Sequence, residues 1–145
     1  MPDQASSNIT INAPSEKVLA VIADIPSYPQ WTGQIKSAEV VETAADGKPQ
    51  QATFVMDAGV LKDEYTLAYT WRPDGVDWHL VGKSTVQKSQ VGSYTLQDQG
   101  DTTEVTYKLT VDIAMPMLGM FKRKAEKMIM DSALKELKKR VETTG

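Results

Sequence analysis

Residues Met115–Glu142 read MPMLGMFKRKAEKMIMDSALKELKKRVE, and this stretch decides the fold of the chain. Pro116 stands near its start, where the missing N–H of a proline costs a helix nothing, and Thr143-Thr144-Gly145 follows its end. Its apolar residues recur at spacings of three and four, the pattern of an amphipathic helix. They are Met117, Leu118, Phe121, Ala125, Met128, Ile129, Ala133, Leu134, Leu137 and Val141. The pattern predicts one long helix whose apolar face needs a partner surface.

The sequence before this helix predicts that the partner is an antiparallel sheet. Short segments alternate between apolar and polar residues, which is the period of a half-buried strand. They are Ser7–Asn12, Ile35–Thr43, Gln51–Ala58, Lys62–Arg72, a segment with Val76, Trp78 and Leu80 on one face, Val86–Gln97 and Thr103–Ile113. Turn signals such as Asp46-Gly47 and Pro73-Asp74-Gly75 make the connections too short for parallel neighbours. We expect one α+β domain over residues 1–145, with a curled sheet of about seven strands around the helix.

Two short helices are expected between the first two strands. Asn12-Ala13-Pro14-Ser15 offers a capping residue and a proline for the first turn of a helix. The apolar residues that follow, Val18 and Ile22 among them, give that helix a buried side. Pro26 and Pro29 end it and favour a tight turn or a second short helix, which reaches Trp31.

Composition excludes several classes of function. The 145 residues carry a net charge of −3 with a pI near 5.2, which argues against nucleic acid as a partner. The chain has no cysteine and one histidine, so disulfides, thiolate catalysis and cysteine-based metal sites are absent. The start of the chain lacks the features of a secretory signal, and no stretch has the length of a transmembrane helix, so we expect a cytoplasmic protein.

Positive charge is concentrated at the end of the chain. Residues 115–145 hold eight Lys and Arg against four Asp and Glu. The simplest interpretation is a solvated helix face with ion pairs at i, i+4, such as Lys127 with Asp131. Two alternatives stay open. The basic strip meets an anionic ligand group or makes a weak contact with an anionic membrane surface, or Lys122, Arg123 and Lys124 bind another protein.

The whole chain resembles the START-like superfamily, also called SRPBCC. The more specific parts of the resemblance are Asp24-Ile25-Pro26-Ser27-Tyr28-Pro29-Gln30-Trp31 and the run Met115-Pro116-Met117-Leu118-Gly119-Met120-Phe121-Lys122-Arg123-Lys124-Ala125-Glu126. The chain is most similar to the polyketide cyclase/dehydrase and lipid-transport family, which is similar to coenzyme Q-binding proteins, and to its small actinobacterial members. The resemblance implies a helix-grip fold with a cavity between sheet and helix. Members of the superfamily bind lipids, polyketides, quinones, sterols or hormones, and some catalyse ring closure, so the resemblance implies a pocket and leaves the activity open.

Catalytic and metal-binding chemistry finds little support in the residues themselves. His79 alternates with Trp78 and Leu80 and is expected to face outward, and no serine stands in a Gly-x-Ser-x-Gly elbow. No phosphate loop is present, and we expect no cofactor and no metal. Four carboxylates in or beside strands remain as acid–base candidates, but alternation points Asp57 and Asp112 toward solvent. The four are Asp57, Asp63, Glu64 and Asp112.

Aromatic residues and methionines are the candidate ligand-binding residues. Tyrosines on the apolar strand faces either bond to backbone and water or orient a ligand carbonyl. Methionines of the last helix either fill an ordinary core or line a deformable pocket, and the resemblance favours Trp31 as a lid at the cavity mouth. The predicted ligand-binding set is Trp31, Phe54, Met56, Tyr65, Tyr69, Trp78, Tyr94, Tyr107, Met117, Leu118, Phe121 and Met128.

The sequence therefore predicts a non-catalytic binding or transport protein for a hydrophobic small molecule, such as a lipid, a quinone or a polyketide. The alternative is a polyketide aromatase/cyclase-like enzyme that acts by positioning its substrate with weak acid–base help. A buried polar group directed into the pocket distinguishes the two hypotheses.

Overall fold

A computed structural model describes residues 5–33, 35–57, 62–82, 84, 87–113 and 119–143. The elements follow in the order β1 (Ala5–Ile11), α1 (Ser15–Ala23), the 3-10 helix η1 (Ile25–Ser27), α2 (Tyr28–Trp31), β2 (Ile35–Thr43), β3 (Pro49–Asp57), β4 (Lys62–Arg72), β5 (Gly75–Val81), β6 (Gln87–Asp98), β7 (Thr103–Ile113) and α3 (Gly119–Thr143). The predicted α+β class is confirmed, and each described strand lies within about two residues of its predicted range.

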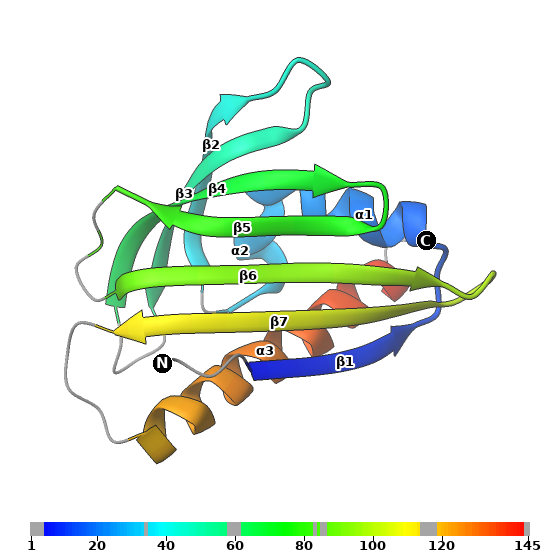
Figure 1. Cartoon of the computed structure of the whole chain (residues 1–145). Helices are drawn as coiled ribbons and strands as arrows, with labels where there is room; N and C mark the ends of the chain where they lie inside the picture. Colours follow the sequence, from blue (N-terminus) through cyan, green and yellow to red (C-terminus); the bar gives the residue numbers. More distant parts are fainter. Residues whose placement is uncertain are drawn as a thin grey trace.

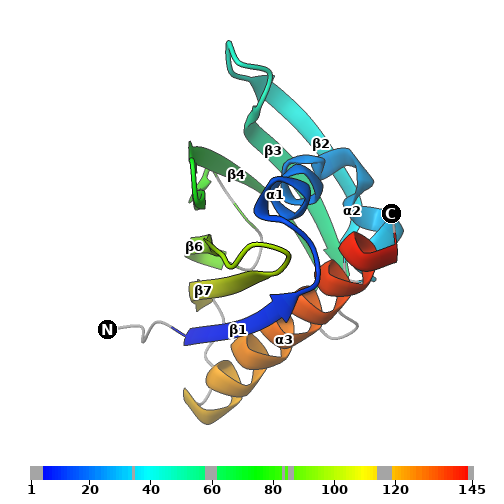
Figure 2. The same ribbon diagram turned by 90° about the vertical axis from the view of Figure 1, so that its right-hand side faces the viewer.

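The strands form one antiparallel sheet in the order β1-β7-β6-β5-β4-β3-β2 (Figure 1). Six of them, β2 to β7, follow one another as a meander, as the short connections predict. The exception is β1, which pairs with β7 so that Ile9 faces Val105. This pairing joins the first strand to the last, and α1 and α2 lie over the same face of the sheet as α3 (Figure 2).

The turn residues explain why the chain reverses between β2 and β3 and between β4 and β5. Gly47 adopts a φ of +87°, a region that favours glycine, and the Asp46 carboxylate accepts from the Lys48 backbone N–H at 3.0 Å. The β4–β5 turn is held by Arg72, which contacts Asp74 and Asp77 at 2.8 Å each. The Asp-Gly and Pro-Asp-Gly signals therefore stand at the two predicted hairpins.

The core lies between α3, α1 and the inner face of β1 and β7. Met130, Leu134, Leu137 and Val141 on α3 are each at most 2% exposed. They pack in one cluster with Ile11, Val18, Ile22, Val105 and Leu109. A fully buried aliphatic side chain contributes roughly 1.5–3 kcal/mol, so this seam is a major source of stability. The helical period of the last thirty residues predicts such a face.

The prediction is wrong for one residue of that apolar face. Met128 is 57% exposed, whereas Met130, left out of the predicted face, is 1% exposed. The two residues stand about 200° apart around a helix with 3.6 residues per turn. Because α3 is rotated so that Met130 stacks above Leu134 and Leu137, Met128 is turned toward solvent. The predicted start of this helix, Pro116, lies outside the described residues.

The start of α1 also differs from the prediction in detail. Pro14 occupies the N-cap position and not the first turn, and no side chain caps the helix. Instead the Thr103 hydroxyl on β7 donates to the Ala13 carbonyl at 2.8 Å, and the Ser15 hydroxyl lies 3.1 Å from Thr103. A tertiary contact therefore fixes the start of α1. Across the described helices, none is long and apolar enough to cross a membrane.

Candidate functional site

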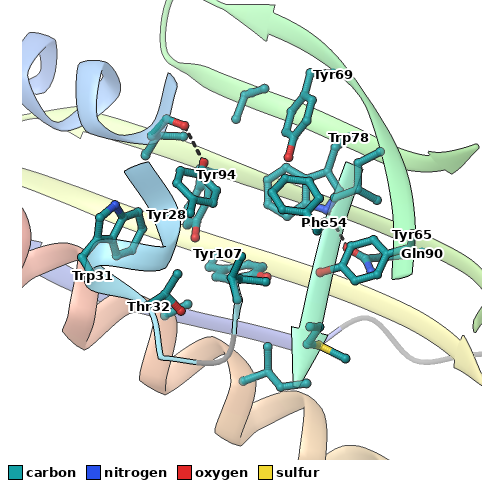
Figure 3. Close-up of a pocket in the computed structure, with 17 residues that line it drawn as sticks. Tyr28, Trp31, Thr32, Phe54, Tyr65, Tyr69, Trp78, Gln90, Tyr94 and Tyr107 are labelled. Atoms are coloured by element: carbon teal, nitrogen blue, oxygen red, sulfur yellow. Dashed lines mark hydrogen bonds between the residues drawn. The ribbon is translucent and has the colours of Figure 1, made fainter. Parts of the chain in front are cut away.

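A cavity of about 110 Å³ lies between the inner face of the sheet, α2 and α3 (Figure 3). Strands β3, β4, β5, β6 and β7 supply inward side chains, and α2 supplies Tyr28 and Trp31. Helix α3 contributes Ile129 and Ala133, which stand beside the core seam on the same helix. The cavity therefore occupies the part of the sheet that the long helix leaves uncovered.

Most of the predicted ligand-binding residues meet at this cavity. Eight of them line it: Trp31, Phe54, Met56, Tyr65, Tyr69, Trp78, Tyr94 and Tyr107. Met128 is exposed and does not line it, because the rotation of α3 that buries Met130 turns Met128 toward solvent. Met117, Leu118 and the side chain of Phe121 lie outside the described residues. That the eight bind a ligand stays a prediction.

Sequence reasoning missed other residues of the wall. They are Ile22, Tyr28, Thr32, Ile35, Leu67, Val76, Gln90, Ile129 and Ala133. Several carried a usable signal, because Leu67 and Val76 share strand faces with predicted aromatic residues. Gln90 stands two residues before Gly92 and four before Tyr94 on β6, so alternation already placed it on the inner face. Tyr28 carried no such periodic signal.

Aromatic rings form two connected walls around the cavity. In the first wall, Tyr28 contacts Trp31 and Phe54 at ring-centroid distances of 5.0 and 6.0 Å, and Phe54 contacts Tyr65 at 5.6 Å. In the second, Trp78 contacts Tyr69, Tyr94 and Tyr107 at 6.2, 5.3 and 5.6 Å. Each such pair contributes about 0.5–1.5 kcal/mol beyond its buried area, so the rings hold one another in place.

Four phenol hydroxyls inside this cavity have no hydrogen-bond partner among the described residues. They belong to Tyr65, Tyr69, Tyr94 and Tyr107, which are 8, 9, 9 and 7% exposed. Figure 3 shows Tyr65, Tyr94 and Tyr107 converging from three strands. Within the described residues, the one fully buried side-chain polar atom without a partner is the indole nitrogen of Trp31, so these four hydroxyls still reach the cavity space and can bond to water or to a polar guest.

Tyr28 and Trp31 are the polar groups of the α2 side. The Tyr28 hydroxyl donates to the Ile22 carbonyl at 2.5 Å, so it is already satisfied. The indole N–H of Trp31 is buried and has no hydrogen-bond partner among the described residues. Trp31 also lines a second cleft, of about 320 Å³, with Lys17 and Arg140, so it contributes to both that cleft and the aromatic cavity.

Burial keeps all of these phenols neutral. Desolvation raises the pKa of Tyr65, Tyr94 and Tyr107 well above the ordinary value, and neighbouring tyrosines raise the pKa of Tyr65 and Tyr94 further. The pKa of Tyr69 is raised for the same reasons. A neutral phenol donates one hydrogen bond and can accept others, so near neutral pH these groups can bind a ligand oxygen but supply no phenolate base.

The catalytic candidates do not reach the cavity. Asp63 is 5% exposed, but it accepts hydrogen bonds from Ser84 and Gln87 and is absent from the cavity wall. His79 is exposed on β5, as alternation predicts, and Asp57 lies 3.9 Å from Lys62 at the end of β3. In the part of the chain that the structure covers, no three His, Cys, Asp or Glu side chains gather as a metal site would require.

Solved structures share this fold. A START superfamily protein from Mycobacterium smegmatis superimposes with a TM-score of 0.91 at 21% identity, over 98% of this chain and 99% of its own. An aromatase/cyclase from Streptomyces gives 0.81 at 11% identity, over 98% and 94%. A STAR-related lipid transfer protein from Xanthomonas axonopodis gives 0.77 at 15% identity, over 97% and 86%.

These likenesses establish the predicted helix-grip fold, in which a curved antiparallel sheet wraps a long C-terminal helix. Among curated proteins, none matches the chain in sequence. A family model described as polyketide cyclase/dehydrase and lipid transport matches residues 3–142, nearly the whole chain. With the fold and the aromatic cavity, that match places the chain in the polyketide cyclase/dehydrase and lipid-transport family of START-like proteins.

Proposed function

We propose that the protein binds a hydrophobic small molecule, such as a lipid, a quinone or a polyketide, in the aromatic cavity. The observation that carries the proposal is the group of four buried phenols that donate to no described residue. Such hydroxyls can exchange hydrogen bonds with water for hydrogen bonds with a polar group of a guest. The surrounding rings supply apolar area, which favours binding by roughly 25 cal/mol for each Å² removed from water.

The size of the cavity limits the guest. Its volume of about 110 Å³ is several times the roughly 10–15 Å³ that one water needs, so it can hold a small ligand or part of a larger one. Ligand sites of drug-sized molecules commonly measure roughly 300–1,000 Å³. A compact ligand therefore fits with the walls in place, and a longer lipid requires movement of wall residues such as Trp31. The partner implied by these walls is apolar over most of its surface.

A polyketide aromatase/cyclase-like activity is the second candidate, and one observation favours it. Phenols that stay neutral donate hydrogen bonds to a carbonyl oxygen, and such bonds strengthen as the oxygen becomes an enolate. The described cavity wall holds no histidine or carboxylate that would remove the proton. Catalysis here would therefore rest on folding and positioning the substrate, which is why binding is the leading proposal.

Filling the cavity tests the proposal. Ala133 lines the cavity from α3, and Ala133→Leu extends a side chain into it. We expect wild-type protein incubated with lipid extract to retain an apolar molecule in native mass spectrometry and to show a raised Tm. We expect A133L to fold and to lose at least about tenfold in affinity, because its leucine occupies the ligand's volume.

The matched control is Lys135→Leu, which adds the same side chain on the exposed face of the same helix. It is expected to bind as the wild type does. A wild-type protein that retains no apolar species, and whose Tm is unchanged across a broad panel of lipids, quinones and polyketides, would overturn the proposal. Equal binding by A133L and the wild type would place the ligand elsewhere.

A further inference from the structure

A chain of side-chain hydrogen bonds runs from a buried carboxylate to the cavity wall. Asp63 Oδ2 accepts from Gln87 Nε2 at 3.0 Å, and Gln87 Oε1 accepts from Gln90 Nε2 at 2.6 Å. Gln90 Oε1 in turn accepts from Trp78 Nε1 at 3.0 Å, the contact drawn as a dashed line in Figure 3. Gln90 and Trp78 line the cavity, whereas Asp63 and Gln87 lie behind it.

The direction of this chain is fixed at both ends. An indole N–H only donates, so the amide atom of Gln90 that faces Trp78 must be its oxygen. A carboxylate only accepts, so the amide atom of Gln87 that faces Asp63 must be its nitrogen. Turning either amide over would set two oxygens or two N–H groups against each other. The orientation of Gln90 is therefore determined by residues outside the cavity.

This orientation leaves Gln90 with one N–H that has no partner among the described residues. The amide nitrogen carries two hydrogens, and the hydrogen bond to Gln87 uses one of them. The other polar atoms of the wall are mainly the phenol hydroxyls, which can both donate and accept. Within the described residues no charged side chain lines the cavity. The wall thus offers several neutral donors and no ionic partner.

We propose that Gln90 is the specificity-determining residue of this cavity, and that it selects neutral, flat ligands by donating to a carbonyl or ether oxygen. Asp63 is its positioning residue, acting through Gln87. This proposal rests on the proposed binding function. It adds that the protein recognises a carbonyl or ether oxygen of the ligand. Hydrocarbons of the same shape fill the aromatic walls but leave the donors unpaired, so they bind less tightly.

Two probes of similar shape test the proposal. Chromone is a flat bicyclic molecule with a carbonyl and a ring ether, and naphthalene is a flat bicyclic hydrocarbon. Equilibrium dialysis gives the affinity of each probe for the wild type, Gln90→Met, Asp63→Asn and the control Gln97→Met, whose side chain is exposed on β6. The measured quantity is the ratio of the chromone affinity to the naphthalene affinity.

We expect the wild type and Q97M to prefer chromone. Q90M is expected to reduce that preference by about fivefold, the value of one neutral hydrogen bond. D63N removes no cavity atom, yet it is expected to reduce the preference because an asparagine can present either atom to Gln87. A merely structural role for these residues would lower both affinities together and leave the ratio unchanged.

Each other outcome counts against a separate part of the proposal. Equal affinity of the wild type for both probes, or an unchanged preference in folded Q90M, overturns the role of Gln90 while binding in the cavity stands. A D63N protein with the full wild-type preference overturns the positioning role of Asp63. Failure of the wild type to bind either probe overturns this proposal, and failure across the lipid, quinone and polyketide panel as well overturns the binding function itself.

Discussion

At the residue scale, Gly92 shapes the cavity wall by lacking a side chain. It stands opposite Trp78 in the β5–β6 ladder, and a Cβ built on it would overlap the Trp78 indole. The indole therefore lies flat over the glycine, in the position from which its N–H reaches Gln90. A glycine inside a strand often marks such a close approach.

Gly92→Ala is expected to destabilise the protein by about 1–3 kcal/mol, because the added methyl group forces the Trp78 ring to move. Urea unfolding measures the loss, and the fluorescence of the folded protein reports the new surroundings of the tryptophan. Gly33→Ala is the control, since nothing lies within 4 Å of the added carbon and its φ is not positive. A G92A protein as stable as G33A, with wild-type fluorescence, would show that Trp78 does not depend on the glycine.

At the element scale, polar contacts tie α3 to the first strand. The Ser7 hydroxyl donates to Asp131 Oδ1 at 2.7 Å, and Lys138 Nζ donates to the Thr10 carbonyl at 2.8 Å. Glu142 accepts from the backbone N–H of Asn12 at 2.9 Å and pairs with Lys138. Of the predicted i, i+4 pairs, Lys127 and Asp131 lie 3.4 Å apart. These contacts set the register of the helix along β1.

The tie through Asp131 makes part of the stability depend on pH. The Ser7 hydrogen bond, followed by the charge of Lys127, lowers the pKa of Asp131 below its ordinary value of 3.8. A carboxyl whose pKa is depressed in the folded state stabilises above the unfolded-state pKa and loses that contribution as the pH falls through the folded one. The effect is small because the side chain is 37% exposed.

Asp131→Asn is therefore expected to be less stable than the wild type near pH 7, with a gap that closes as the pH falls below about 4. Urea unfolding at a series of pH values measures the gap. Glu39→Gln, an exposed carboxylate on β2, is the control and is expected to show no comparable gap. A gap for D131N that is constant from neutral to acid pH would contradict an electrostatic origin.

At the scale of the whole molecule, the tyrosines form a large group of titratable side chains in the interior. The sequence holds five tyrosines, and burial raises the pKa of every one of them above 10.0. Unfolding returns each phenol to its ordinary pKa. The folded state therefore binds more protons than the unfolded state once the pH exceeds that value, and stability falls as the pH rises.

We expect the free energy of unfolding to be steady from neutral pH to about pH 10 and then to fall by up to about 1.4 kcal/mol per pH unit for each tyrosine. Ultraviolet absorbance measures tyrosinate directly, and circular dichroism measures unfolding in the same samples. The two transitions are expected to coincide. Tyrosinate that forms at about pH 10 while the protein stays folded would show that water reaches the phenols.

The long helix, the strands and their antiparallel order could all be predicted from the amino-acid sequence, because they depend on periods of 3.6 and 2 residues and on turn residues that are local to each segment. Alternation also predicted which aromatic residues face inward from the strands, and six of these line the cavity, together with the predicted Trp31 and Met56. The rotation of α3 that buries Met130 and exposes Met128 was decided by packing against β1, β7 and α1. The helical period does not predict which of the two methionines is buried, since both fit a broad apolar face.

The existence of the cavity and the hydrogen bonds around it depend on contacts between distant segments, which no local pattern contains. The pairing of β1 with β7, the approach of Tyr28 to Phe54, and the chain from Asp63 to Gln90 each join segments far apart in the sequence. Alternation tells which way a side chain points, but the space left between facing side chains depends on the curvature of the sheet and the position of the helix. For that reason many residues of the cavity wall could be predicted from the sequence. The volume of the cavity, and which of its hydroxyl and amide groups lack a partner among the described residues, could not.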